Sequence, residues 1–377
     1  MSTQSGKRLR IRRGDGTRTL ANGELEFDYV NSKLRVGDGT SVGGIGLSGQ
    51  SGFNLTRTSS GYVFPSETNL LSIYAGETAG YDVGGNTTNG EKIERYSFVS
   101  DGNATEVGQL KSGPTYHVAH AVGAASPSHG FVAGGEQGYP RSLSTAIMQF
   151  PFAASGVDAV DTGGDLTTQM RFCAGITDIN DSKGYWAGNY NATVNTVGRK
   201  QLEHYPTVTG SGNATDAADL AEFRSTATGA SSTTEGFVFG GLDLNYSDSI
   251  EKFPFASDSS SVQPATLTAH RSEINRNGSQ SPTHVYLAGG RQVPSTAVDT
   301  IEKFTFAADT PAVDVGELYA AVKSQTMTTS TTSGYLAGGV SSDTIQKFPF
   351  ASDQNGTDVG EITKGSGHTT SVGGIQF

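Results

Sequence analysis

The chain has 377 residues with 51 glycines, one cysteine and a formal net charge of −11, enough for two domains or one large all-β unit. A single cysteine excludes internal disulfides and thiolate metal clusters. No apolar run approaches the roughly 20 residues of a membrane span, and the basic N-terminal segment lacks the apolar core of a secretory signal, so we expect assembly in a cytoplasm without membrane insertion.

Residues 1–50 are predicted to form a small β module. Short β segments at 9–13, 23–29 and 33–39 are separated by Asn-Gly and Asp-Gly turns. A module of this size buries little core alone, so we expect it to need a second copy of itself or a docking surface. Residues 51–75 are interpreted as a connector.

The first thirteen residues carry five Lys or Arg and no acid. Such a cluster could contact nucleic acid or an acidic partner, but a solvated basic strand is the favoured interpretation. The rest of the chain is strongly acidic, which argues against nucleic-acid binding over most of the surface.

The module also carries an ordered RRG, GEL and GDGT pattern. Its residues are Arg12, Arg13, Gly14, Leu20, Gly23, Glu24, Leu25, Lys33, Leu34, Gly37, Asp38, Gly39 and Thr40. This pattern is similar to the N-terminal module of bacteriophage tail-fibre and related virion proteins. The resemblance implies attachment to other virion proteins through this module, often as an intertwined trimer.

A unit of about fifty residues repeats six times after residue 75. Its marker is an aromatic residue, two apolar or small residues and Gly-Gly, with a weaker copy ending in Asn. The copies end at Gly85, Gly135, Asn189, Gly241, Gly290 and Gly339, in steps of 50, 54, 52, 49 and 49 residues. Each copy continues with a Tyr/Phe strand, a polar turn, an outer strand and a basic residue that opens the next strand. Four short antiparallel strands repeated in this way are typical of a β-propeller blade.

The order of these strands is similar to a kelch repeat. The departure is the outer strand, which lacks the usual Trp; the only Trp, Trp186, lies in the Gly-Gly strand. The segment 367–377 aligns with 116–126, so we expect it to complete the first blade beside Tyr81–Gly85 and remove an exposed sheet edge. The predicted fold class is therefore all-β: a six-bladed kelch-like propeller, residues 76–377, preceded by the small N-terminal module.

A basic residue recurs near the start of each innermost strand. The set is Lys111, Arg171, Arg224, Arg271, Lys323 and Lys364. These residues could hold an anion or an acidic sugar on one face of the propeller. Alternatively, each could pair with an acid of an adjacent blade such as Glu94, Glu251 or Glu302, and this structural interpretation is favoured.

The loops between the second and third strands should lie on the same face as these basic residues. They vary most in length and carry aromatic, amide and Arg side chains that suit sugar faces and hydroxyls, although such residues also occur in ordinary loops. The candidate contacts are Tyr139, Arg141, Tyr190, Arg199, Asn245, Tyr246 and Arg291.

We expect no catalytic residue, metal or cofactor. Cys173 lies in an expected innermost strand, where a free Cys is commonly a small buried apolar residue rather than part of a Cys–Tyr copper centre. His117 and His120 are expected on opposite faces of one strand, which argues against a two-His metal site. The Asn-x-Ser/Thr triplets at Asn103, Asn213 and Asn355 fall at the same turn of different copies, so they indicate turn chemistry rather than glycosylation.

These expectations favour a virion structural protein, a tail fibre or appendage whose propeller recognises a host-surface glycan or protein. One alternative is a capsid-decorating or tail-packing protein without receptor binding. A carbohydrate-active enzyme would need two facing carboxylates, and no acidic pair that interrupts the repeat can be nominated.

Overall fold

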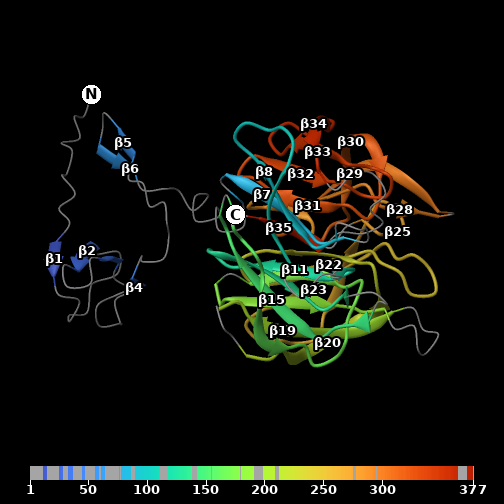
Figure 1. The fold of residues 1–377 in the computed structure, drawn as a ribbon, viewed down its shortest axis with the longest axis horizontal. Helices are drawn as coiled ribbons and strands as arrows, with labels where there is room; N and C mark the ends of the chain where they lie inside the picture. Colours follow the sequence, from blue (N-terminus) through green and yellow to red (C-terminus); the bar gives the residue numbers. More distant parts are fainter. Residues whose placement is uncertain are drawn as a thin grey trace. The chain divides into compact units, whose positions relative to one another are not determined.

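The computed structural model describes strands within residues 12–63 and, beyond them, residues 76, 78–85, 90–110, 118–137, 142–153, 155–178, 180–190, 198–208, 212–274, 277–293, 295–363 and 372–376. The regular elements in these residues are all β-strands, which confirms the all-β fold class (Figure 1). None of the described residues forms a helix that is long and apolar enough to cross a membrane. The chain divides into two compact units, Met1–Leu70 and Leu71–Phe377.

The first unit contains one four-stranded sheet and a hairpin. The sheet runs in the order β1 (Arg12–Gly14), β2 (Leu25–Asp28), β3 (Lys33–Val36) and β4 (Ile45–Gly46), with β1 parallel to β2 and the other pairs antiparallel. The hairpin joins β5 (Thr56–Thr58) and β6 (Gly61–Val63). The expected segments 23–29 and 33–39 contain β2 and β3, and the expected segment 9–13 overlaps β1 at Arg12 and Arg13. Of the residues that carry the virion-module resemblance, seven lie outside the described residues: Leu20, Gly23, Glu24, Gly37, Asp38, Gly39 and Thr40.

The second unit contains, within its described residues, five four-stranded antiparallel sheets and one six-stranded sheet that follow the sequence repeat. The six-stranded one is sheet 5, which also includes β25 (Arg271–Ser272) and β28 (Arg291–Gln292). Sheet 1 is β35 (Val372–Gln376), β7 (Ala79–Val83), β8 (Lys92–Ser97) and β9 (Thr105–Gln109); sheet 2 is β11 (Val122–Ala125), β12 (His129–Ala133), β15 (Ala146–Pro151) and β16 (Val160–Asp165). Sheet 3 is β17 (Ala174–Asp178), β18 (Lys183–Ala187), β19 (Arg199–Pro206) and β20 (Thr215–Arg224); sheet 4 is β21 (Thr228–Ser231), β22 (Glu235–Phe239), β23 (Ser249–Pro254) and β24 (Val262–Thr266). Sheet 5 is β26 (Ser279–Gln280), β27 (His284–Ala288), β29 (Thr296–Thr305) and β30 (Val313–Val322); sheet 6 is β31 (Thr326–Thr329), β32 (Ser333–Ala337), β33 (Thr344–Pro349) and β34 (Thr357–Glu361).

The first strands of the sheets contact one another in a closed succession. β35 contacts β11 and β31, β11 contacts β17, β17 contacts β21, and β26 contacts β31. The amide of Gly278 donates to the carbonyl of Gly229 at 2.7 Å, which joins sheet 5 to sheet 4. Figure 1 shows β35 beside β7 and β31. β35 thus occupies the position that the sequence alignment assigns to the C-terminal segment, and the arrangement is consistent with a β-propeller-like one.

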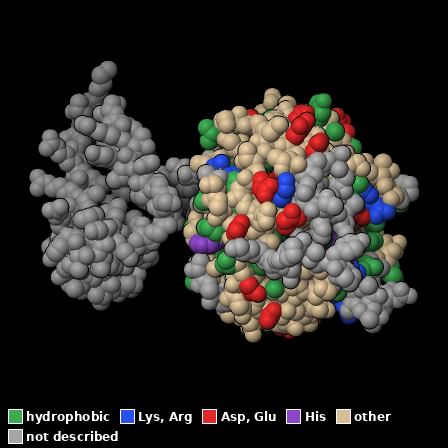
Figure 2. All heavy atoms as spheres, in the orientation of Figure 1, with side chains coloured by type: hydrophobic (Ala, Val, Ile, Leu, Met, Phe, Trp, Pro, Cys, Tyr) green, Lys and Arg blue, Asp and Glu red, His purple; other side chains and the backbone are tan. Residues whose placement is uncertain are grey.

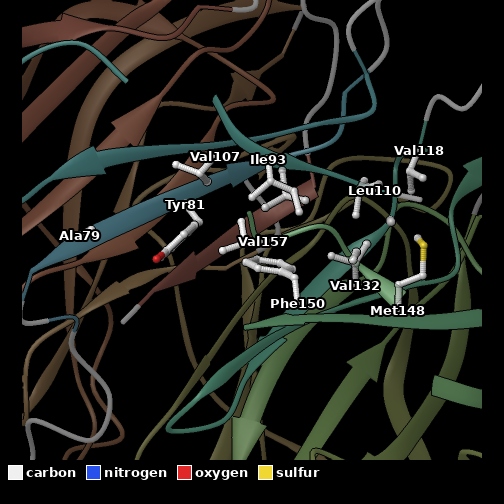
Figure 3. Packing of buried hydrophobic residues seen from close by; sticks show 13 residues of the cluster. Ala79, Tyr81, Ile93, Val107, Leu110, Val118, Val132, Met148, Phe150 and Val157 are labelled. Atoms are coloured by element: carbon white, nitrogen blue, oxygen red, sulfur yellow. The ribbon is translucent and has the colours of Figure 1, made fainter. Parts of the chain in front are cut away.

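The core lies between neighbouring sheets. Between sheets 1 and 2, Tyr81, Ile93 and Val107 pack in one buried cluster with Val132 and Phe150 (Figure 3). The repeat also explains a glycine that recurs in the second strand of every sheet except sheet 5, where Val285 takes its place. A Cβ on Gly236 would lie 2.3 Å from Cζ of Phe253 on the adjacent strand, so the aromatic ring of the third strand occupies the space that a side chain would need.

Buried third-strand side chains fasten each sheet to the one before it. Glu94, Glu203, Glu251, Glu302 and Gln346 are each at most 1% exposed. Their side-chain oxygens accept the backbone N–H groups of Thr363, Thr167, Ala221, Thr268 and Ala320, respectively, at 2.8–3.1 Å. In sheet 2 the equivalent position is Met148, which packs in the core instead. Each of these bonds gives a backbone donor in or just after a fourth strand a partner in the next sheet.

The turns between third and fourth strands make a second set of joints. Asn103, Asn213 and Asn355 accept the backbone N–H groups of Glu361, Asp165 and Glu317 at 3.0–3.1 Å, in each case from the fourth strand of the preceding sheet. The interpretation of these Asn residues as turn chemistry is confirmed. They also cover part of an exposed strand edge, which protects it from pairing with other chains.

Candidate functional site

The loops between second and third strands lie on one face with the segments that carry the basic residues; we call it the loop face. Tyr190 donates its backbone N–H to the carbonyl of Arg171 at 3.1 Å, and Val340 donates to Lys323 at 3.0 Å. In sheet 5, β28 (Arg291–Gln292) pairs with β25 (Arg271–Ser272), and in sheet 2, β13 (Glu136–Gln137) pairs with β10 (Val118–Ala119) and β14 (Ser142–Leu143). These contacts place the loop beside the basic residue in sheets 3, 5 and 6, as expected.

Two of the basic residues are structural. Arg224 and Arg271 are 0% exposed, and their Nη2 atoms lie 2.5 Å and 3.3 Å from carboxylate oxygens of Glu251 and Glu302. Burial lowers the pKa of both guanidinium groups, and burial likewise raises the pKa of Glu302 although the charge of Arg271 opposes this. The favoured interpretation is therefore confirmed for these two pairs. Lys111 and Lys364 lie outside the described residues.

Arg171 and Lys323 behave differently because they keep part of their surface on the loop face. The guanidinium of Arg171 contacts the carboxylate of Glu136 and lies 4.7 Å from the centroid of the Tyr190 ring. Nζ of Lys323 lies 3.6 Å from a carboxylate oxygen of Glu273. Partly exposed pairs such as Arg171–Glu136 and Lys323–Glu273 leave charged atoms at the surface. Figure 2 shows that acidic and basic side chains are interspersed on the face of the described surface in view.

The structure joins the candidate contacts into two aromatic–arginine pairs. The guanidinium of Arg171 lies over the Tyr190 ring, and the guanidinium of Arg291 lies 5.6 Å from the centroid of the Tyr246 ring. Nη1 of Arg291 donates to Glu273 at 2.7 Å, and this bond raises the pKa of Arg291. Pairs of this type hold both partners in defined positions at the surface.

The other candidates are placed less centrally. Asn245 is exposed beside Tyr246, while Arg199 opens β19, where its backbone is paired with Arg224. Tyr139 and Arg141 lie outside the described residues. The structure therefore groups three of the seven candidates, Tyr190, Tyr246 and Arg291, with partners on the loop face.

Five residues form a set that the sequence reasoning missed: His120, Phe172, Thr226, Glu273 and Ser324. They occupy the same position in successive copies, before the first strand of sheets 2 to 6, with φ between 49° and 60°. Each later member donates its backbone N–H to the carbonyl of the member before it, at 2.6–3.2 Å. We call this set the left-handed arc. Its residue types differ in every copy, so only an alignment of all six copies with a knowledge of φ would reveal it.

His120 also corrects one expectation. It was expected to share a strand with His117, but it follows β10 in a turn and has φ 60°, because the chain must bend there to enter β11. Its Nδ1 lies 3.2 Å from a carboxylate oxygen of Glu136. His117 itself lies outside the described residues.

The buried setting expected for Cys173 is confirmed. The residue is 1% exposed and lies immediately before β17, with its Sγ 3.5 Å from the carbonyl oxygen of Arg171. Among the described residues, no group of three His, Cys, Asp or Glu side chains is arranged to hold a metal ion.

Comparison with protein-family models and with curated proteins finds no matching family and no matching protein.

Proposed function

We propose that residues 76–377 form a six-bladed, kelch-like β-propeller. The proposal is supported by the six sheets that follow the repeat, five of them four-stranded, by the closed succession of their first strands and by the pairing of β35 with β7. A propeller whose first blade combines strands from both ends of its sequence leaves no sheet without its inner partner.

We further propose that the chain is a bacteriophage virion structural protein, a tail fibre or appendage that recognises the host surface. The N-terminal module attaches it to other virion proteins, as a homotrimer if the resemblance extends to assembly. The observation that carries recognition is the pairing of Tyr190 with Arg171 and of Tyr246 with Arg291 on loops held by a rigid β scaffold. Aromatic and Arg side chains of this kind dominate binding surfaces, and variable loops on rigid scaffolds are common sites of recognition.

Adsorption of the full-length protein to the bacterium that the phage infects tests this function. We expect fluorescently labelled wild-type protein to bind the cells, and we expect Tyr246→Ala and Arg291→Ala to bind about tenfold less, as loss of a hot-spot contact predicts. Lys303→Ala is the matched control, because Lys303 pairs with Asp353 at the turns between third and fourth strands, away from the loop face. Absence of adsorption by the wild-type protein would contradict recognition and favour capsid decoration or tail packing.

A further inference from the structure

The left-handed arc keeps side chains where glycine would be the easier choice. The described chain uses glycine at sixteen positions with positive φ, and its other non-glycine residues with positive φ are all Asp or Ser. The arc instead contains Phe172 and the β-branched Thr226, for which this conformation is strained. Strain of this kind persists where the surrounding structure enforces it, and it concentrates at ligand-binding positions.

The side chains of sheets 2 and 3 give the arc an aromatic part. The rings of His120 and Phe172 have centroids 4.0 Å apart, and the Phe172 ring meets that of Tyr190 edge-on at 5.7 Å. Phe172 and Tyr190 are half-buried, so part of this aromatic surface is open on the loop face. A half-open group of rings offers a flat apolar surface with a hydroxyl at its edge.

The side chains of sheets 5 and 6 give the arc a polar part. Glu273 accepts from Arg291 at 2.7 Å and lies 3.6 Å from Nζ of Lys323, with the Ser324 hydroxyl 3.4 Å from its second oxygen. Carboxylate, hydroxyl, ammonium and guanidinium groups thus gather within one hydrogen-bonded group. Thr226 lies between the two parts. Its backbone hydrogen bonds to Phe172 and Glu273 connect the aromatic part to the polar part.

The charges of this group leave one cation in excess. Arg291 and Lys323 share the single carboxylate of Glu273, while Arg171 is paired with Glu136 in the aromatic part. The neighbouring group of Arg224, Glu222 and Glu251 carries the opposite excess, so the positive charge is local to sheets 5 and 6. The three cationic side chains are 17–28% exposed, so each can still meet a ligand.

We propose that the left-handed arc and its cationic neighbours bind a sugar residue that bears a carboxylate. A pyranose ring has an apolar C–H face that fits the Phe172–Tyr190 surface and hydroxyls that suit the side chains of Glu273 and Ser324. The sugar carboxylate takes the excess positive charge, with Lys323 as its partner. This inference rests on the proposed host-surface recognition and names its ligand class.

Titration of the full-length protein with D-glucuronate and with D-glucose, followed by saturation-transfer NMR, tests the assignment. We expect glucuronate to bind at least about tenfold more tightly than glucose, which lacks the carboxylate. Lys323→Met should remove that preference, and Phe172→Gly should weaken both sugars while relieving backbone strain. Lys252→Met is the matched control, because Lys252 is 20% exposed against 23% for Lys323 and pairs with Asp309 at the other end of the sheets.

Equal binding of the two sugars, or no binding of glucuronate at millimolar concentration, would overturn the assignment. So would an unchanged preference in Lys323→Met, a variant that leaves the arc backbone intact and keeps the test valid if Phe172→Gly unfolds. Adsorption to cells separates the two proposals. If the wild-type protein adsorbs but ignores glucuronate, the ligand class is wrong and host recognition stands; if it does not adsorb, host recognition itself fails.

Discussion

The carboxylate of Glu94 accepts the backbone N–H of Thr363 at 2.8 Å, although the two residues are 269 positions apart in the chain. Glu94 lies on β8 of sheet 1, and Thr363 follows the last strand of sheet 6. The hydroxyl of Thr363 donates to the same oxygen. The joint between the last and the first sheet therefore uses the same buried acid that joins sheets 2 and 3, 3 and 4, and 4 and 5.

Removing this acid should weaken the whole second unit. Glu94→Ala removes the buried carboxylate that accepts the N–H and hydroxyl of Thr363, so we expect the free energy of unfolding to fall by about 1–3 kcal/mol, as for other hydrogen bonds to charged groups. Urea denaturation followed by circular dichroism measures the change. Glu361→Ala, at an exposed side chain on β34, is the control and should shift stability by less than about 0.5 kcal/mol. Equal losses of unfolding free energy in the two variants would show that the joint between Glu94 and Thr363 does not stabilise the fold.

Removing residues 372–377 should have a larger effect because it deletes β35. The truncated chain loses the partner of β7 and the contacts of β35 with β11 and β31. We expect a lower melting temperature and association of exposed β7 edges, seen by circular dichroism and gel filtration. A synthetic peptide of residues 366–377 should restore monomeric behaviour. A truncated chain with the same melting temperature as the full-length protein would contradict the closed succession of strands.

The second-strand glycine offers a sharp test of the packing between adjacent strands. Gly236→Ala places a methyl group against the Phe253 ring, and we expect a loss of about 1–3 kcal/mol from overpacking. Gly212→Ala is its counterpart, since a Cβ there meets nothing within 4 Å, and it should be neutral or slightly stabilising. Comparable thermal melts for the two variants would rule out the close approach of the ring.

Two histidines at equivalent positions should make stability depend on pH. Burial lowers the pKa of His129, and burial, followed by the charge of Lys303, lowers the pKa of His284 from an ordinary value of 6.5. Because the folded state then binds fewer protons than the unfolded chain, their contribution is complete above pH 6.5 and is lost as the pH falls through the lowered pKa values.

Replacement of both histidines by Asn isolates this effect. We expect the stability of the double variant to fall less than that of the wild type between pH 6.5 and 5. The wild type and the double variant are compared at each pH because Glu302 affects the stability of both. The raised pKa of Glu302 makes its contribution to stability decrease as the pH rises, opposite to that of the histidines. Parallel stability curves for the two proteins would show that these histidines do not titrate differently on unfolding.

Much of the fold follows from the repeat in the sequence. The fifty-residue period and the strand-like phrases predict the four-stranded sheets, and the alignment of the C-terminal segment predicts its place beside β7. The pairing of Arg224 with Glu251 was also predictable, since a recurring base and a recurring acid had to meet if both were buried. Local repetition is a strong signal because each copy repeats the same packing problem.

The candidate site was harder to predict. Contacts such as that between Tyr246 and Arg291 join loops of adjacent sheets, and their variable lengths conceal the register. The left-handed arc has no shared residue type, and His120 was wrongly expected in a strand because a φ near 60° is not visible in its sequence context. Tyr139 and Arg141 stay predictions.

Immunoelectron microscopy of intact phage particles, with antibodies against residues 76–377, tests the central claim most directly. The account predicts label at the tips of tail appendages, where a host-recognising propeller must be displayed. Label over the capsid shell, or epitopes that stay hidden on intact particles, would contradict host recognition and make the protein a structural part of the particle.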